Sequence, residues 1–270
     1  MRRPARPIAC LALAAATAIL YAQTATLRVS EPEIRAAQAY QAAVRGGPLS
    51  LRAFLVDFPK GADLHVHLSG AVYAETFIHD AGQDGLCVDS AALSFAKPPC
   101  NPPLIPASRL YNNLSPANQD LYDRLVNSFS MRSFVPTAGF SGHDQFFSTF
   151  GRFSGLSKEH TGEWVDEIAS RAAAQNQQYL ELMETPLFAH AQNIAYQGPW
   201  GPGSAVVQPD DNAQINFAQY RQAFIAAGLR DEVAADREDV RSAEAQRRQI
   251  EHCGTPQAAP ACQVEIRYIY

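Results

Sequence analysis

The sequence predicts an α/β fold, and two observations support this prediction. Three short segments with strand patterning, 62–68, 179–183 and 263–270, alternate with helical segments in the order that parallel βαβ units show. The chain has 270 residues, 47% of them hydrophobic, which is enough to form a packed core. Since a (β/α)₈ barrel typically takes about 250 residues, the length alone leaves room for one.

The N-terminal residues 1–22 are typical of a signal peptide. Three arginines precede an apolar run over residues 8–22, and small residues follow that run. The run is shorter than the roughly 20 residues that cross a membrane, so a stable membrane anchor is the less favoured alternative. We therefore expect the protein to be exported, to the periplasm or out of the cell.

Export determines how the cysteines are interpreted. Four cysteines follow the signal peptide as two close pairs, Cys87 with Cys100 and Cys253 with Cys262. An even number of cysteines in an oxidising compartment favours disulfides, although four cysteines allow three connectivities. The two local bridges are the prediction, because short loops close most easily. A zinc knuckle is the alternative, but no C-x-x-C pattern occurs.

The first segment after the signal peptide, 23–57, is expected to be a helical extension. Ser30 and Glu33 form a capping-box pattern, and apolar residues follow at helical spacing. A second short helix is expected over 49–56. The main domain then covers 58–270.

An insertion is expected at 80–135, after a short helix over 71–79. Its proline-rich stretch 97–103 cannot form a regular helix or a central strand. Beyond the insertion come an aromatic helical face, a helix over 162–177 and one long helical stretch over 212–251.

Charge and motifs exclude several functions. The formal net charge is −5 and no basic stripe is visible, so nucleic acid is not an expected partner. The glycine patterns of nucleotide-binding loops and the G-x-S-x-G nucleophile elbow are absent. The H-x-E and P-C-x-x-C signature of cytosine and tRNA-adenine deaminases is also absent.

His65 and His67 are the residues that indicate chemistry. In a strand, residues two apart point to the same side, so the two imidazoles project together near the end of the strand. Two neutral imidazoles are half of a typical Zn²⁺ site. The H-x-H triplet alone is a weak signal; its context of Pro-Lys before and Leu-x-Gly after makes it stronger.

Residues 58–79 resemble the opening strand of the adenosine deaminase family, through the pattern Pro-Lys-x-x-x-Leu-His-x-His-Leu-x-Gly. The Pro-Lys-Gly form after a helical extension is most similar to the secreted, growth-factor-like branch of this family. The aromatic segment from residue 146 is similar to the family's helix with paired aromatics. The match is sharp over 58–79, moderate over 143–190 and weak over 210–270.

This resemblance implies a (β/α)₈ barrel that deaminates adenosine, or a related adenine nucleoside, to inosine and ammonia. His65 and His67 match the first two ligands of the family's Zn²⁺, and Phe146 and Phe150 match the aromatic lid over the nucleoside. The expected partner is thus a small nucleoside; the sequence does not indicate an oligomeric state. Ser69 departs from the aspartate that contacts ribose in many members.

The remaining family residues have no counterpart at the expected places. The resemblance assigns a third histidine ligand, an aspartate ligand and a general-acid glutamate in a His-x-Gly-Glu stretch to later strands, beyond Tyr270. The chain therefore looks C-terminally truncated, with about three of eight strands, and we expect no turnover from it alone. His190 is the one other histidine expected near the same rim; Glu181 and Glu184 carry no mark of an acid. The other histidines are expected to be solvated: His79, His143, His160 and His252.

Two alternative functions stay open. H-x-H on a first barrel strand is shared by other metal-dependent amidohydrolases, which would act on acidic or imide substrates. The incomplete ligand set instead favours a secreted, non-catalytic binding or signalling protein.

Overall fold

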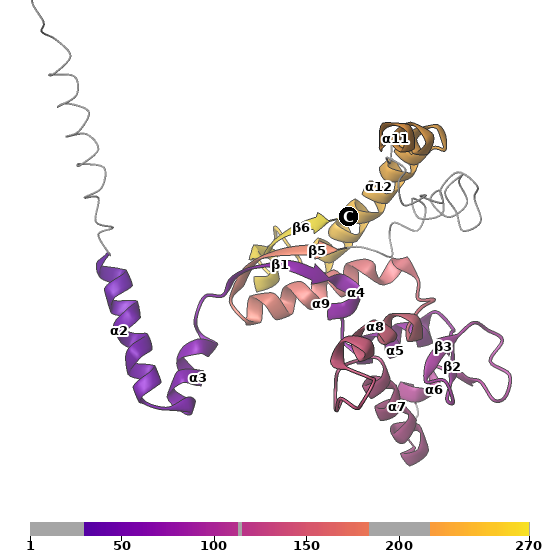
Figure 1. The fold of residues 1–270 in the computed structure, drawn as a ribbon, viewed down its shortest axis with the longest axis horizontal. Helices are drawn as coiled ribbons and strands as arrows, with labels where there is room; N and C mark the ends of the chain where they lie inside the picture. The colour runs from indigo at the N-terminus through magenta and orange to yellow at the C-terminus, as the bar shows by residue number, and fades with distance from the viewer. Residues whose placement is uncertain (1–29, 113–114, 184–216, 270) are drawn as a thin grey trace, which may run out of the picture. The chain divides into compact units, whose positions relative to one another are not determined.

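A computed structural model describes residues 30–112, 115–183 and 217–269 of the chain (Figure 1). The chain divides into two compact units, Met1–Phe58 and Pro59–Tyr270. The predicted signal peptide at 1–22 lies outside the described residues. Among the described residues, no helix combines the length and the hydrophobicity that a membrane span requires.

The first unit contains two helices, α2 (Glu31–Arg45) and α3 (Pro48–Val56). Ser30 and Glu33 form the capping box that the sequence predicts, with the Glu33 side chain accepting from the Ser30 backbone N–H at 2.6 Å. Gly47 joins the helices with a φ of 88°, a left-handed conformation that glycine adopts without steric cost.

A three-stranded parallel sheet forms the centre of the second unit. Its order is β1-β5-β6, with β1 at Gly61–His67, β5 at Gln177–Met183 and β6 at Glu265–Ile269. Helix α9 (Thr161–Ala174) covers one face of the sheet (Figure 1). The alternation in β5 follows from this packing, because Leu180 and Leu182 are buried while their neighbours along the strand are half-buried or exposed. The predicted parallel α/β arrangement is confirmed at the level of these three strands.

The insertion contains a small antiparallel sheet that the sequence did not predict. Strand β2 (Cys87–Asp89) pairs with β3 (Ser94–Ala96) on one side and with β4 (Ile105–Pro106) on the other. The predicted Cys87–Cys100 disulfide is confirmed and spans 13 residues. As expected, residues 97–103 are neither helical nor in a strand.

The helices around this small sheet share one hydrophobic core with it and with the parallel sheet. They are α5 (Ala74–Gln83), α6 (Arg109–Asn112), α7 (Pro116–Ser128) and α8 (Gly142–Arg152). Aromatic rings connect the two regions: Phe77 of α5 stacks on Phe153 at 4.4 Å between centroids and contacts Trp164 of α9 edge-on at 5.3 Å.

The C-terminal helical region differs from the sequence prediction. The stretch expected as one helix over 212–251 is interrupted: α11 (Phe217–Ala226) ends before Gly228, whose φ is 97°, and α12 (Leu229–Ile250) begins after it. Residues 212–216 lie outside the described residues. A left-handed glycine ends one helix and allows the chain to start another.

Helix α12 packs on α9 and leads back to the sheet. The short 3₁₀ helix η3 (Pro260–Gln263) precedes β6, and the predicted Cys253–Cys262 disulfide closes the loop before it. The buried Arg247 guanidinium pairs with Glu251 and Glu244, and the Tyr268 hydroxyl of β6 donates to Glu244 at 2.6 Å. These contacts fix β6 against α12.

Candidate metal and substrate site

His65 and His67 lie at the C-terminal end of β1, directly before α4 (Leu68–Ala71), and project to the same side. Their ring centroids are 5.2 Å apart; His65 is exposed and His67 half-buried. Two imidazoles that share one tetrahedral zinc have centroids roughly 5 Å apart, since each ligating nitrogen lies about 2.1 Å from the ion. The pair therefore fits half of a zinc site. Among the described residues, it belongs to no group of three potential ligands close enough to hold one ion.

A bulge in β1 positions these histidines. Asp63 pairs with Leu180 and Val66 pairs with Leu182, so two residues of β1 stand opposite Glu181 alone. The Asp63 carboxylate accepts from the His65 backbone N–H at 3.2 Å within this bulge. The sequence predicted a regular strand here. An extra residue shifts the alternation, so it decides the face on which His65 lies.

Gly70 brings the histidine strand against the aromatic helix. A Cβ added at Gly70 would lie 3.3 Å from the Phe150 ring, 3.4 Å from the Phe146 ring and 3.5 Å from the Cβ of His67. A side chain at this position would thus force its neighbours apart. Gly70 therefore lies between His67, one of the two predicted zinc ligands, and both predicted substrate aromatics, although about 80 residues separate His67 from Phe146 in the sequence.

A cavity of about 450 Å³ opens beside Gly70. Ser69, Gly70 and Tyr73 line one side, and Phe146 and other residues of α7 and α8 line the other. Its surface is mostly apolar with a few polar groups, which is the usual character of a small-molecule site. His65 and His67 do not line it, and neither does Phe150. The cavity is next to the histidine pair and does not enclose it.

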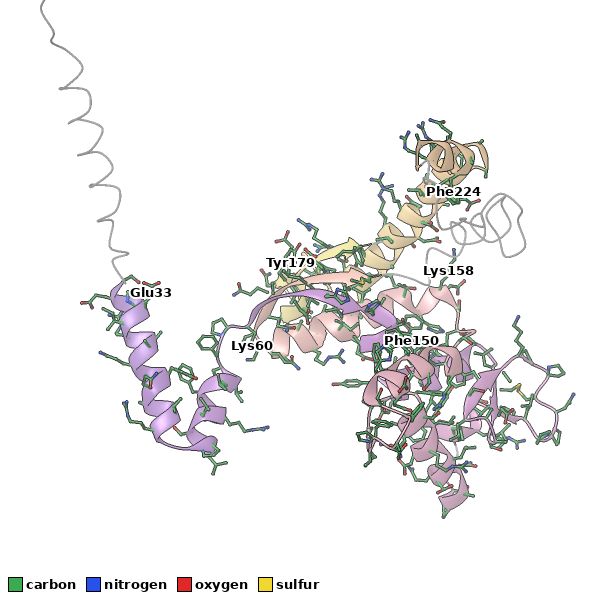
Figure 2. The ribbon with its side chains drawn as sticks, viewed as in Figure 1. Glu33, Lys60, Phe150, Lys158, Tyr179 and Phe224 are labelled. Carbon is green, nitrogen blue, oxygen red and sulfur yellow. A yellow bond between two sulfur atoms is a disulfide. The ribbon has the colours of Figure 1, made fainter. Side chains whose placement is uncertain are left out.

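Phe146 and Phe150 have different surroundings. Their rings meet edge-to-face at 5.1 Å between centroids, and both lie on the face of α8 that approaches α4 (Figure 2 labels Phe150). Only Phe146 contributes to the cavity wall. Of the two predicted substrate contacts, Phe146 is therefore the better placed to touch a ligand in the cavity. Phe150 packs against the Phe146 ring outside the cavity lining.

The capping box of α8 orients this aromatic face. The Asp144 carboxylate accepts from the Ser141 backbone N–H and hydroxyl, both at 2.7 Å, and the Ser141 hydroxyl accepts from the Asp144 N–H at 3.4 Å. The Ser141 backbone hydrogen bond holds the pKa of Asp144 below its usual value. These bonds fix where α8 begins and hence which residues face Gly70.

The predictions for the other acidic residues and histidines are confirmed for some residues and wrong for one. His190 and Glu184 lie outside the described residues. Glu181 is half-buried on β5 and accepts from the Tyr179 hydroxyl at 3.0 Å. As predicted, His79, His143 and His252 are exposed. The prediction for His160 was wrong: this residue is only 8% exposed.

His160 is buried because α5 packs over it. Its ring nitrogens lie 3.0 Å from an Asp84 oxygen and 3.1 Å from a Glu163 oxygen, and Asp84 belongs to a segment 76 residues away. The sequence gives one missed signal, a His-x-x-Glu spacing after the helix cap Ser157, which places both side chains on one helical face. Residues 160–163 also read His-x-Gly-Glu, but no described hydrogen bond or ion pair joins them to His65 or His67.

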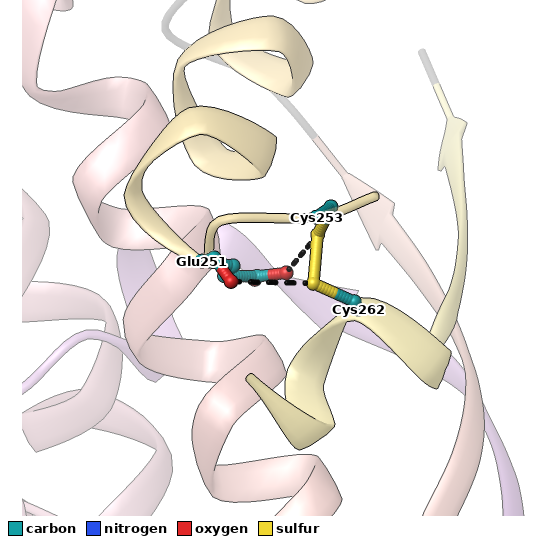
Figure 3. A group of neighbouring side chains, drawn as sticks. All are labelled: Glu251, Cys253 and Cys262. Atoms are coloured by element: carbon teal, nitrogen blue, oxygen red, sulfur yellow. Dashed lines mark hydrogen bonds between the residues drawn. A yellow bond between two sulfur atoms is a disulfide. The ribbon is translucent and has the colours of Figure 1, made fainter. Parts of the chain in front are cut away.

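A further group of residue types that can bind metal ions is held together by a disulfide and an ion pair. Glu251, Cys253 and Cys262 lie together, and the two sulfurs form a disulfide (Figure 3). Disulfide sulfurs are not thiolates, so they do not supply the ligands that zinc requires. The Glu251 carboxylate, 3.2 Å from the Cys253 sulfur, is instead held by Arg247 at 2.9 Å.

Comparison of the whole chain with protein-family models and with curated proteins finds no match.

Proposed function

We propose that the His65–His67 pair and the adjacent cavity form part of an adenosine deaminase-type site on the first strand of a (β/α)₈-like hydrolase domain. The observation that carries this proposal is the position of Gly70, which lies close to His67, Phe146 and Phe150 at the edge of a cavity of about 450 Å³. The reaction would be hydrolysis of adenosine to inosine and ammonia.

In this proposal His65 and His67 hold the zinc and Phe146 contacts the purine. Zinc supplies a bound water of lowered pKa, which is the nucleophile that such a hydrolysis requires. Phe146 presents a ring to the cavity, and aromatic side chains stack on bases with about 1–3 kcal/mol each.

The first experiment tests nucleoside binding. The purified chain is titrated with adenosine, inosine and cytidine by calorimetry, and adenosine is expected to bind most tightly. Phe146→Ala is expected to weaken adenosine binding about tenfold, because it removes the stacking surface. The matched control is Phe147→Ala, since Phe147 is 59% exposed on the same helix and outside the cavity lining. Equal loss in both variants, or no saturable binding of adenosine, would contradict the proposed substrate site.

The second experiment tests the reaction. Adenosine-to-inosine conversion is followed by absorbance, with zinc content measured on the same sample. Two imidazoles are half of a four-ligand set, so we expect weak zinc binding at this pair and no conversion by this chain alone. Conversion that His67→Ala abolishes would support the reaction and show that the missing groups come from residues we have not assigned.

Among the described residues only two ligands lie at this pair, and this also supports a second candidate, a secreted protein that binds nucleosides without chemistry. Adenosine binding that persists unchanged in His65→Ala and His67→Ala chains, with no conversion in any zinc concentration, would favour this candidate. Binding of imide or acidic substrates in place of nucleosides would favour another metal-dependent amidohydrolase.

A further inference from the structure

A second group of ligand-type side chains lies where α5 meets the start of α9. Asp80 comes from α5, His160 from the 3₁₀ helix η1 (Lys158–His160) and Glu163 from the first turn of α9. One atom of each residue lies within 4.8 Å of the others. The His160 Nδ1 is 3.1 Å from Glu163 Oε2 and 3.9 Å from Asp80 Oδ1. Tetrahedral zinc ligands lie roughly 3.3 Å apart, so the His160–Glu163 separation is close to a coordinating one, and Asp80 would have to move closer to His160.

Outer hydrogen bonds orient the ligand atoms. The His160 Nε2 lies 3.0 Å from Asp84 Oδ1, and the other Asp84 oxygen accepts from the Ser157 backbone N–H at 2.8 Å. The indole N–H of Trp164 donates to Asp80 Oδ2 at 2.7 Å, so the other Asp80 oxygen is the one that faces His160. Metal-binding histidines almost always donate their second ring nitrogen to such a carboxylate or carbonyl.

The geometry at Nδ1 requires a cation. With the Nε2 proton directed at Asp84, a neutral His160 would present a lone pair at Nδ1 to the Glu163 oxygen, and two acceptors at 3.1 Å repel each other. Either a second proton or a metal ion relieves this repulsion. The two possibilities differ in charge, because a proton adds one positive charge and a divalent ion adds two.

The charge balance favours the divalent ion. Three carboxylates, Asp80, Asp84 and Glu163, surround one imidazole, and no described ion pair joins any of them to a lysine or arginine. Asp80 is 2% exposed, so little solvent reaches its carboxylate. The imidazole of His79 also lies near it, with Nδ1 3.6 Å from Asp80 Oδ1, and its side chain is 53% exposed. With all three carboxylates ionised, a protonated His160 would leave two negative charges in excess, and the charge on the buried Asp80 is costly unless it is compensated.

We propose that Asp80, His160 and Glu163 bind a divalent transition-metal ion, with Zn²⁺ as the best match, and that this ion joins α5 to α9. An imidazole ligand disfavours Mg²⁺ and Ca²⁺, which select oxygen ligands. Three protein ligands leave a fourth position for water, and Glu163, whose side chain is 46% exposed, gives that position access to solvent. The site is separate from the His65–His67 pair and does not depend on the function proposed above.

The test uses the full chain with His65→Ala and His67→Ala, so that zinc bound at the strand pair cannot contribute. Zinc is titrated against this chain after chelator treatment, and thermal unfolding is recorded with and without zinc. We expect one zinc per chain and a Tm raised by roughly 5 °C at a hundredfold excess over Kd. Absence of a bound zinc in this background would overturn the proposal while leaving the deaminase-type site untested by the same result.

Variants at the proposed site separate it from adventitious zinc binding. Glu163→Gln changes a partly exposed ligand with little risk to folding, and we expect it to weaken zinc binding at least tenfold. Asp84→Asn changes the outer partner of His160 and is expected to weaken it about 10- to 100-fold. Glu159→Gln is the matched control, because Glu159 is an exposed neighbour outside the group. Equal affinity in Glu163→Gln and Glu159→Gln would overturn the assignment, as would a Co²⁺ absorption spectrum unchanged by Glu163→Gln.

Discussion

The strand pair His65–His67 and the group around His160 differ in how their side chains are held. His65 and His67 lie near the end of a strand, one exposed and one half-buried, with few side-chain partners. His160 lies at the junction of two helices, where both ring nitrogens contact carboxylates and those carboxylates have partners of their own. The first region is evident in the sequence, and the described residues supply only two ligands for it. The second is structurally complete and nearly invisible in the sequence.

The difference follows from the distance in sequence over which each region is assembled. An H-x-H pair needs only the two-residue period of one strand, so a short pattern predicts it. The His160 group needs α5 to pack on the start of α9, and its contacts join residues 76 to 84 apart. Sequence motifs therefore detect sites built from residues close together in the chain, whether or not the full set of ligands is present.

Trp164→Ala is expected to have the largest effect, because it removes both the ring packed on Phe77 and the donor to Asp80. Trp164 is 5% exposed, so its loss should lower the free energy of unfolding by about 3–5 kcal/mol. Urea denaturation of the metal-free chain measures this. Trp164→Phe keeps most of the packing and should cost less. A loss below about 1 kcal/mol in the alanine variant would show that the helix junction is not the better-supported region.

His160→Ala and His67→Ala compare the two regions directly. Removing His160 takes one hydrogen-bond partner from each of the Asp84 and Glu163 carboxylates, so we expect a loss of about 1–3 kcal/mol. Removing the half-buried His67 should change stability by no more than about 0.5 kcal/mol. Both values come from denaturation in the presence of a chelator. Equal effects would remove the proposed distinction between a supported and an unsupported site.

Gly70→Ala tests the packing beside the strand pair. The added methyl group would press on the Phe146 and Phe150 rings at 3.3–3.4 Å, so we expect a loss of about 1 kcal/mol and weaker adenosine binding. Gly151→Ala is the control on α8, because nothing lies within 4 Å of its added Cβ and alanine favours a helix. This control should be neutral or slightly stabilising. Unchanged nucleoside binding in Gly70→Ala would separate the cavity from the proposed function.

The pH dependence of α8 should be the smallest effect. The pKa of Asp144 is lowered in the folded state by its hydrogen bonds to Ser141. The cap therefore contributes stability above the unfolded pKa of about 3.9, and the contribution is lost as the pH falls through the folded value. Thermal unfolding between about pH 6 and about pH 3 measures it. Asp144→Asn should lose stability less steeply on acidification than the unmodified chain; parallel curves would contradict the cap's role.

The sequence was sufficient for the features that depend on local pattern. The three parallel strands, the capping box at Ser30 and both disulfides are as predicted, because alternation, cap chemistry and short loop closure act over a few residues. Phe146 and Phe150 were assigned from resemblance, and their contact with Gly70 could not be derived from spacing. The eight-stranded barrel remains a prediction.

The features that were missed depend on tertiary contacts or on single backbone conformations. Nothing in the polar stretch around His160 indicates that Asp84 covers it. The bulge at Asp63 shows only in the pairing with β5. Gly228 lies inside an otherwise helical pattern, and only its positive φ turns the predicted single helix into two. Each of these requires knowledge of which segments meet.

The pairing of His67 with Met183 has a consequence for how this protein must fold. Side chains alternate between the two faces of a sheet, so a slip of one residue between β1 and β5 would move His67 to the face that α9 covers. Such a slip would also bring Val66 out of the core. Burial of the apolar residues in the sheet therefore also fixes the face on which the imidazoles lie. A chain with the wrong register would lose both the stability of the sheet and the proposed metal ligands.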